Sequence, residues 1–375
     1  MHVSRLAPTL LSGLFTVLNA AASEPAPEFI RNGAAGFVVE HIEYALATQI
    51  ADRTVCPAGF TPSPRRFEKN NPSLPMSAGL PACANPQAAG PDPNFRIVSG
   101  RGAKGHGVDL DHRHSRSSDI EPGICAHDDF VGMNGEQGID NQFYRAVGCL
   151  QGYQSNALGN SFATEMLSGS WGILISVSGI DDYRDDAQVD VGFFANADPI
   201  MLSPNRQALA YATYAIHRDP QFRAHTKGSI VDGVLTTEPV DMRFRKVTNS
   251  MYLDRPLLGA VAQLSLGADG TLEGYLAGYT PVTALYDLEF AFRDARNAEG
   301  QPAKQRLIAL SSRGRSLNLH YTCNGIYHAL ERLADGYPDR ATGKCTSIST
   351  QYRIRAIPAF VVDAQTESLN ERLVR

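Results

Sequence analysis

Acidic residues and histidines gather in two stretches of the chain, and side chains of these types bind metal ions or transfer protons. The stretches are HGVDLDHRHS, residues 106–115, and CAHDDFVGMNGEQGIDNQFYRAVGC, residues 125–149. Alternate residues of a strand share a face, so a strand over the first stretch would point Asp109 and Asp111 to one side. His112 and His114 would point to the other side. The two faces define two different candidate metal sites.

Calcium is the candidate for the acidic face, because Ca²⁺ takes about six to eight oxygen ligands. The oxygen donors are Asp109, Asp111, Asp128, Asp129, Asp140 and Asn141. Residues 134–142, NGEQGIDNQ, place such donors around glycines that allow tight turns. The spacing differs from that of an EF-hand, since Arg113 stands where a third acidic ligand belongs and no bidentate glutamate closes the loop.

Zinc is the candidate for the other face, because neutral imidazole nitrogens bind it. The possible ligands are His106, His112, His114 and His127. The spacing signal is a single H-x-H, and the H-E-x-x-H motif is absent. A third interpretation needs no metal: the carboxylates are solvated or accept backbone N–H groups in turns, and the histidines are hydrogen-bonded.

The sequence lacks the motifs of the common enzyme classes. It has no G-x-S-x-G elbow, no P-loop and no G-x-G-x-x-G. Paired carboxylates can still act as acid and base on a glycosidic bond, and Trp171 with nearby tyrosines could stack on sugar rings, although aromatic residues beside strands more often belong to the core. A secreted hydrolase with a metal- or carboxylate-dependent site near residues 106–142 is therefore the alternative to a binding protein.

The first residues are typical of a secretory signal peptide. MHVSRLAPTLLSGLFTVLNAAAS has Arg5 near its start, an apolar run over 10–18, and small residues at 20–22 that fit a cleavage site. The apolar run is too short to span a bilayer, and no later stretch is long enough. We expect an exported protein, periplasmic or extracellular, without a transmembrane segment.

The six cysteines indicate disulfides, because an even number in an exported chain usually pairs. They are Cys56, Cys83, Cys125, Cys149, Cys323 and Cys345. They fall into three neighbouring couples, and pairing within each couple would close three local loops. This spacing predicts the bonds Cys56–Cys83, Cys125–Cys149 and Cys323–Cys345.

From about residue 95 the pattern is that of antiparallel strands. The runs SWGILISVSG and AQVDVGFF flank an acidic turn, and Asp232-Gly233 and Asp269-Gly270 each lie between two β-branched runs. The tail STQYRIRAIPAFVVD predicts a closing strand. The predicted fold is mostly β (α+β), an antiparallel β-sandwich or jelly roll.

Two C-terminal helices complete the main domain. Residues 280–300 offer Thr280 as N-cap and Pro281 in the first turn, followed by apolar residues at helical spacing. A second helix over 322–336 would turn Ile326, Leu330 and Leu333 inward.

The N-terminal part differs from the rest in composition. Residues 28–52 fit either a helix or a strand, and the stretch 56–93 is too rich in proline for a regular element. We expect a signal peptide over 1–22, an N-terminal segment with a proline-rich arm over 23–94, and a β-rich main domain over 95–375.

Three segments carry a resemblance to known proteins: CAHDDF…GIDNQFYRAVGC, SIVDGVLTTEPVDMRF and LADGYPDRATGKCTSIS. With them the region from Val98 to the C-terminus resembles a group of uncharacterised exported bacterial proteins that have no established activity. The resemblance implies a bacterial, exported setting and implies that 125–149 organises the fold. It assigns no catalytic residue.

Charge and composition exclude several partners. The formal net charge is −5, with 43% apolar residues, so the chain offers no basic face for nucleic acid or anionic lipid. The first hypothesis is therefore a non-catalytic, disulfide-stapled binding or structural module of the envelope or secretome, stabilised by Ca²⁺ and no other cofactor. Its partner would be a glycan or another envelope component; oligomeric state is not encoded in any recognisable pattern.

Overall fold

The computed structural model describes residues 27–46, 53–63, 80–100, 102–116, 125, 127–154, 157, 162–169, 171–248, 251–286, 289–296, 298, 302–306 and 318–363. The expected signal peptide, 1–22, lies outside these residues. No helix in the described ranges has the length and apolar character needed to cross a bilayer.

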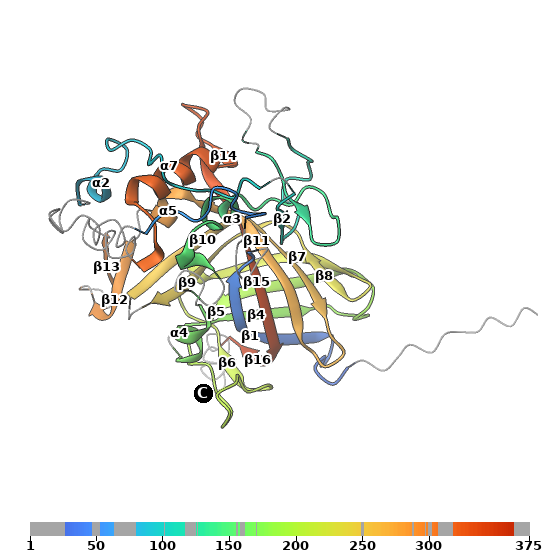
Figure 1. The fold of residues 1–375 in the computed structure, drawn as a ribbon. Helices are drawn as coiled ribbons and strands as arrows, with labels where there is room; N and C mark the ends of the chain where they lie inside the picture. Colours follow the sequence, from blue (N-terminus) through green and yellow to red (C-terminus); the bar gives the residue numbers. More distant parts are fainter. Residues whose placement is uncertain are drawn as a thin grey trace, which may run out of the picture.

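One large antiparallel sheet forms the framework (Figure 1). Its central strands run in the order β11-β15-β1-β4-β5-β7-β8-β10, and β10 also pairs with β11, so this part of the sheet closes on itself. The strands are β1 (Ala34–Tyr44), β4 (Ile173–Ser178), β5 (Asp186–Ala195), β7 (Arg223–Val231), β8 (Val234–Thr237), β10 (Met251–Leu266), β11 (Leu272–Pro281) and β15 (Cys345–Pro358). The predicted mostly-β antiparallel fold is confirmed, and opposite walls of the sheet face each other as in a sandwich.

Shorter strands extend this sheet or form two small ones. β9 (Val240–Thr248) and β12 (Glu289–Arg296) pair with β10, β13 (Pro302–Arg306) pairs with β12, and β14 (Gly336–Pro338) pairs with β15. The small sheets are β2 (Lys104–Gly105) with β3 (Val131–Gly132), and β6 (Thr213–Ala215) with β16 (Phe360–Val362).

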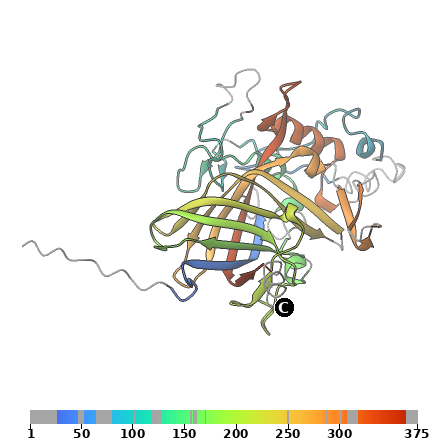
Figure 2. The same cartoon turned by 180° about the vertical axis from the view of Figure 1, so that it is seen from behind.

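The helices are short and lie around the ends of the closed sheet. They are α2 (Leu80–Ala84), α3 (Gln142–Val147), α4 (Ala163–Leu167), α5 (Val282–Tyr286) and α7 (Cys323–Leu333), with 3-10 turns η2 (Gln151–Tyr153) and η4 (Pro220–Phe222). Both ribbon views place α3, α5 and α7 at one end of the sheet and α4 with β6 at the other (Figures 1 and 2).

The enclosed core is rich in aromatic rings. Tyr352 of β15 stacks on Tyr44 of β1 with ring centroids 5.0 Å apart, and Phe244 of β9 meets Tyr352 edge-on at 5.5 Å. Trp171 stacks on Phe244 at 6.2 Å. Rings from three different strands thus meet in the interior, where aromatic pairs add to the free energy gained by burying their area.

The predicted hairpins are confirmed. Asp232 and Gly233 link β7 to β8 with φ values of 51° and 75°, as a two-residue type I′ turn requires. Asp269 and Gly270 lie in the turn between β10 and β11. The closing strand expected near the C-terminus is β15, followed by β16.

One of the two expected C-terminal helices has to be corrected. Thr280 and Pro281 end β11, only Val282–Tyr286 is helical, and the chain then continues as β12. Pairing of Thr280 with Ile348 in β15 outweighs the local capping signal. The other helix is α7, which buries Ile326, Leu330 and Leu333.

The N-terminal segment expected to precede the main domain belongs partly to it. β1 lies between β4 and β15, so of the two alternatives for this stretch the strand is confirmed, and residues 34–44 form a central strand of the main sheet. The sheet therefore begins inside the range 23–94.

The predicted local disulfides are wrong, because all three bonds join distant parts of the chain. They are Cys56–Cys149, Cys83–Cys323 and Cys125–Cys345, with sequence separations of 93, 240 and 220. The N-terminal segment passes over the sheet end that carries α3 and α7, so cysteines far apart in sequence become neighbours there. Spacing along the chain holds no information about this crossing.

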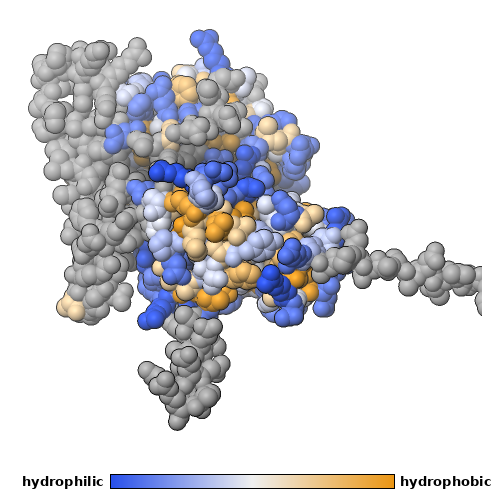
Figure 3. Space-filling model, turned by 90° about the horizontal axis from the view of Figure 1, so that it is seen from below, coloured by the Kyte–Doolittle hydropathy of each residue, from blue (hydrophilic) through white to orange (hydrophobic). Residues whose placement is uncertain are grey.

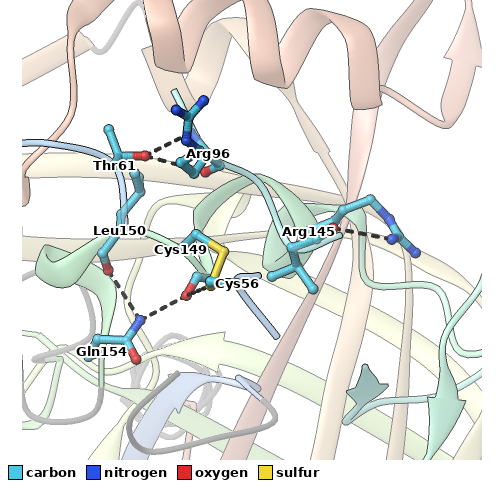
Figure 4. The surroundings of a disulfide bond; sticks show 9 residues. Cys56, Thr61, Arg96, Arg145, Cys149, Leu150 and Gln154 are labelled. Atoms are coloured by element: carbon cyan, nitrogen blue, oxygen red, sulfur yellow. Dashed lines mark hydrogen bonds between the residues drawn. A yellow bond between two sulfur atoms is a disulfide. The ribbon is translucent and has the colours of Figure 1, made fainter. Parts of the chain in front are cut away.

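The bond Cys56–Cys149 shows how the stapled end is built (Figure 4). Gln154 Nε2 donates to the carbonyl oxygens of Gly148 and Leu150, at 2.9 and 3.2 Å. The backbone N–H of Thr61 donates to the carbonyl of Cys149 at 3.0 Å. The disulfide therefore fixes the chain that leaves α3 against the N-terminal segment.

The opposite end of the molecule carries apolar surface. In the view from below, apolar residues gather on this face among polar ones (Figure 3). Exposed large apolar side chains of the loop between β5 and β6 and of β16 are Met201, Leu202, Leu209, Tyr211 and Phe360.

Removing the third disulfide should destabilise the protein. The bond Cys125–Cys345 closes a long loop, so the double substitution Cys125→Ser/Cys345→Ser should lower the free energy of unfolding by about 2–5 kcal/mol. Urea unfolding without reductant measures this change.

A single substitution distinguishes the two pairing schemes. Cys125→Ser should leave Cys345 as the thiol that alkylates, as shown by peptide mass spectrometry. Alkylation of Cys149 instead would restore the local scheme.

Candidate functional site

Three aspartates converge at the end of the sheet that carries α3 and α7. Carboxylate oxygens of Asp109, Asp111 and Asp140 all lie within 4.8 Å of one another, so the group could hold a metal ion. Two come from the 106–115 stretch and one from the residues just before α3. The structure thus unites the two segments in which the sequence predicted a cation site.

Asn141 positions this group through its hydrogen bonds. It is the N-cap of α3, where its Oδ1 accepts from the N–H of Tyr144 at 3.1 Å, the usual role of asparagine at a helix start. Its Nδ2 donates to the carbonyls of Ala45 and His106, at 2.9 and 3.0 Å. Asn141 therefore ties α3 to β1 and to the first stretch; its role as a ligand stays a prediction.

Gln351 of β15 holds the two acidic segments in register. Its Nε2 donates to the carbonyls of Val108 and Asp140, at 2.8 and 2.6 Å, and its Oε1 accepts from the N–H of Val108 at 3.2 Å. Gly107 has φ 140°, and a Cβ there would lie 2.4 Å from Gln351 Cδ. Only glycine leaves room for this buried amide.

Backbone N–H groups are the hydrogen-bond donors to the three carboxylates. Asp140 Oδ2 accepts from Leu110 and Asp111, at 2.7 and 3.3 Å. Asp109 Oδ1 accepts from the N–H of His112, and Asp111 Oδ1 from that of Arg113. Among the described residues no Lys, Arg or His forms an ion pair with any of the three.

Two further carboxyl groups stand close enough to repel this group. Asp129, a predicted ligand, accepts from the N–H of Ser115 at 2.5 Å. Asp335 follows α7 and accepts from the N–H of Ser349 at 2.7 Å. Sequence reasoning missed Asp335 because it read LADG only as a helix end; an Asp-Gly directly after a buried helix was the available signal.

Burial raises the pKa of several of these carboxyls. It raises the pKa of Asp140 to about 8, and the like charges of Asp111, Asp335 and Asp129 add to the effect. Burial likewise raises the pKa of Asp335 to about 7 and that of Asp129 to about 6. A carboxyl buried near other carboxylates holds its proton, so without a cation the group cannot be fully ionised at neutral pH.

The remaining predicted calcium ligand lies outside the three-aspartate group. The carbonyl oxygen of Asp128 accepts from Gln142 Nε2 at 2.9 Å and from Arg145 Nη2 at 2.6 Å. Asp128 therefore contributes its backbone to the anchoring of α3.

The four histidines do not form a zinc site. His106 Nδ1 lies 3.0 Å from Tyr275 Oη, and His127 Nε2 lies 3.2 Å from the carbonyl of Ala334, while His112 and His114 are exposed. The aspartates are the group of three metal-ligating side chains found within the described ranges. Burial lowers the pKa of His106 and of His127, which favours the neutral, hydrogen-bonding form of both rings.

Comparison of the chain with protein families, with curated proteins and with solved structures finds no match. Function is therefore argued from the residues of this chain.

The raised pKa values predict that the metal-free protein loses stability as the pH rises from 6.5 to 8. In this window the folded protein keeps protons on Asp140 and Asp335 that the unfolded chain has lost, so unfolding releases protons and becomes easier at higher pH. Histidines with a lowered pKa oppose this trend only below about pH 6.5. Urea unfolding in calcium-free buffer at several pH values measures the slope.

Asp140→Asn should reduce this slope, because the amide does not titrate. Asp190→Asn is the matched control, since Asp190 is an exposed aspartate of β5, and it should keep the slope of the unaltered protein. Equal slopes in all three proteins would contradict the assignment of the pH dependence to Asp140.

Proposed function

We propose that this protein is an exported, disulfide-stapled β-rich binding module. A calcium ion stabilises the end of the sheet that carries α3 and α7. The ligands are Asp109, Asp111 and Asp140, with Asp129 and Asp335 adding negative charge. The observation that carries the proposal is the approach of three carboxylates to within 4.8 Å with no ion-paired cation among the described residues. Such repulsion persists in a fold only when something offsets it.

The donor set favours calcium over transition metals. Every side-chain ligand in the group is a carboxylate oxygen, and hard oxygen ligands suit Ca²⁺ or Mg²⁺, whereas zinc and copper favour nitrogen and sulfur. Carboxylates carried by two separate loops suit the irregular coordination of Ca²⁺ better than the strict octahedron of Mg²⁺.

Two lines of support favour export. The three disulfides suit an oxidising compartment, and the first 22 residues have the pattern of a signal peptide. We place the protein in the periplasm or outside the cell.

A glycan or another envelope component is the proposed partner. Trp171, Tyr144 and Tyr153 are buried in the core, so they do not offer a stacking surface for sugars. Tyr337 does: its side chain is 42% exposed and it packs edge-on against Tyr279, with centroids 5.6 Å apart. Burial raises the pKa of Tyr279, and the nearby charges of Asp140, Asp335 and Asp111 raise it further. The exposed ring of Tyr337 therefore adjoins the acidic group through Tyr279.

Calcium should stabilise the protein through this site. Calcium at about 100 times its dissociation constant should raise the free energy of unfolding by about 2.7 kcal/mol, and chelator should reverse the effect. Melting curves and metal analysis on protein exported with its disulfides intact measure both.

Substitutions locate the effect. Asp111→Ala should abolish the calcium response because it removes one of the three carboxylate ligands, and Asp190→Ala should leave it unchanged. A calcium response that survives Asp111→Ala would place the ion elsewhere, and no response in the unaltered protein would reject the proposal.

A hydrolase is the second candidate, and the pKa of Asp140 favours it. A carboxyl with a pKa of about 8 is protonated at neutral pH and can act as a general acid on a substrate bound beside the group. Screening glycans for newly released reducing ends tests this activity.

Asp140→Asn separates the two functions. In a hydrolase it should lower turnover at least about 100-fold while the free energy of unfolding is kept or raised. In a binding module stabilised by calcium, the substitution should remove the calcium response, and neither the unaltered protein nor the variant should show turnover.

A further inference from the structure

A second polar feature lies in the interior, away from the aspartates. Arg255 of β10 is 4% exposed. Its Nη1 donates to the carbonyl oxygen of Ala284 at 2.9 Å, and its Nε is buried without a hydrogen-bond partner. A guanidinium remains charged at every physiological pH, so this is a buried positive charge.

No described acidic residue neutralises this charge. Every ion pair among the described residues involves other cations, and the neighbour held by Arg255 is a neutral carbonyl. An unpaired buried charge is costly, and proteins offset that cost with an opposite charge.

Arg255 lines a cavity of about 20 Å³ between the sheet and the helices α3, α5 and α7. The other walls are mainly aromatic and aliphatic; they include Tyr44, Phe143, Tyr286, Tyr321, Ile326 and Leu330. A single water needs about 10–15 Å³ measured this way, so the space matches a group of one or two oxygen atoms.

We propose that this cavity binds the carboxylate group of a small organic acid, which pairs with Arg255. Nε and Nη2 form one edge of the planar guanidinium, and no described residue accepts from either. That edge donates two parallel hydrogen bonds to a carboxylate.

The same geometry argues against other anions. Phosphate and sulfate carry more charge and more oxygens than one guanidinium edge satisfies, and no second basic residue among those that the structure describes lines the cavity. A halide accepts no bidentate pair, so it gains less from this edge than a carboxylate does.

The test uses the exported, oxidised protein in calcium-free buffer of constant ionic strength. Sodium acetate, sodium chloride and sodium sulfate are titrated separately while the melting temperature is recorded. We expect a saturable rise with acetate and only small, unsaturated changes with the other two salts. Equal responses to all three salts, or saturation by chloride alone, would overturn the proposal without any variant.

Variants assign the response to Arg255. Arg255→Lys keeps the charge but lacks the planar pair of donors, so it should bind acetate at least tenfold more weakly, and Arg255→Met should not respond. Arg243→Met is the control, because Arg243 of the adjacent strand is ion-paired with Asp254 and half exposed. Full acetate affinity in a folded Arg255→Lys protein would also overturn the proposal.

Discussion

The end of the sheet that carries α3 and α7 depends on one electrostatic constraint: several carboxyl groups are enclosed there in a small volume. Asp109, Asp111 and Asp140 meet within 4.8 Å, and Asp335 beside them is buried. Backbone N–H groups lower the energy of their charges but do not neutralise them. The group is stable either with protons retained or with a cation bound. The free energy of unfolding therefore depends on the pH in the first state and on the cation concentration in the second.

The disulfides and two buried amides hold these carboxyls together against their repulsion. Cys125–Cys345 fixes the start of the second acidic stretch to β15, and Cys56–Cys149 fixes the chain after α3. Between these bonds, Gln351 and Asn141 connect the stretch to β15 and β1 through hydrogen bonds to backbone groups. Covalent and polar contacts thus supply a rigid frame on the closed sheet, and a site on a rigid frame keeps its geometry when its ligand leaves.

Much of the sheet could be predicted from the sequence, because hairpins are local. Asp232-Gly233 marks a turn by its own conformational preference, whereas the disulfides and the place of β1 depend on how distant segments cross. Thr280 shows the same limit: its capping signal is local, but its strand partner, Ile348, lies far along the chain. For the site, residue type identified Asp109, Asp111 and Asp140. Two features could not be predicted because they depend on the folded structure. They are the role of Asn141 as the N-cap of α3 and the position of Asp335 beside the three aspartates.

Calorimetric titration of calcium into the oxidised protein at pH 7, in buffers with different ionisation enthalpies, shows whether calcium binding displaces protons from the aspartate group. If the aspartate group is the cation site, one calcium ion binds per chain and about one proton or more is released, because Asp140 is protonated in the free protein and must ionise to coordinate. The heat then depends on the buffer. Absence of binding, or binding with the same heat in every buffer, would contradict the account.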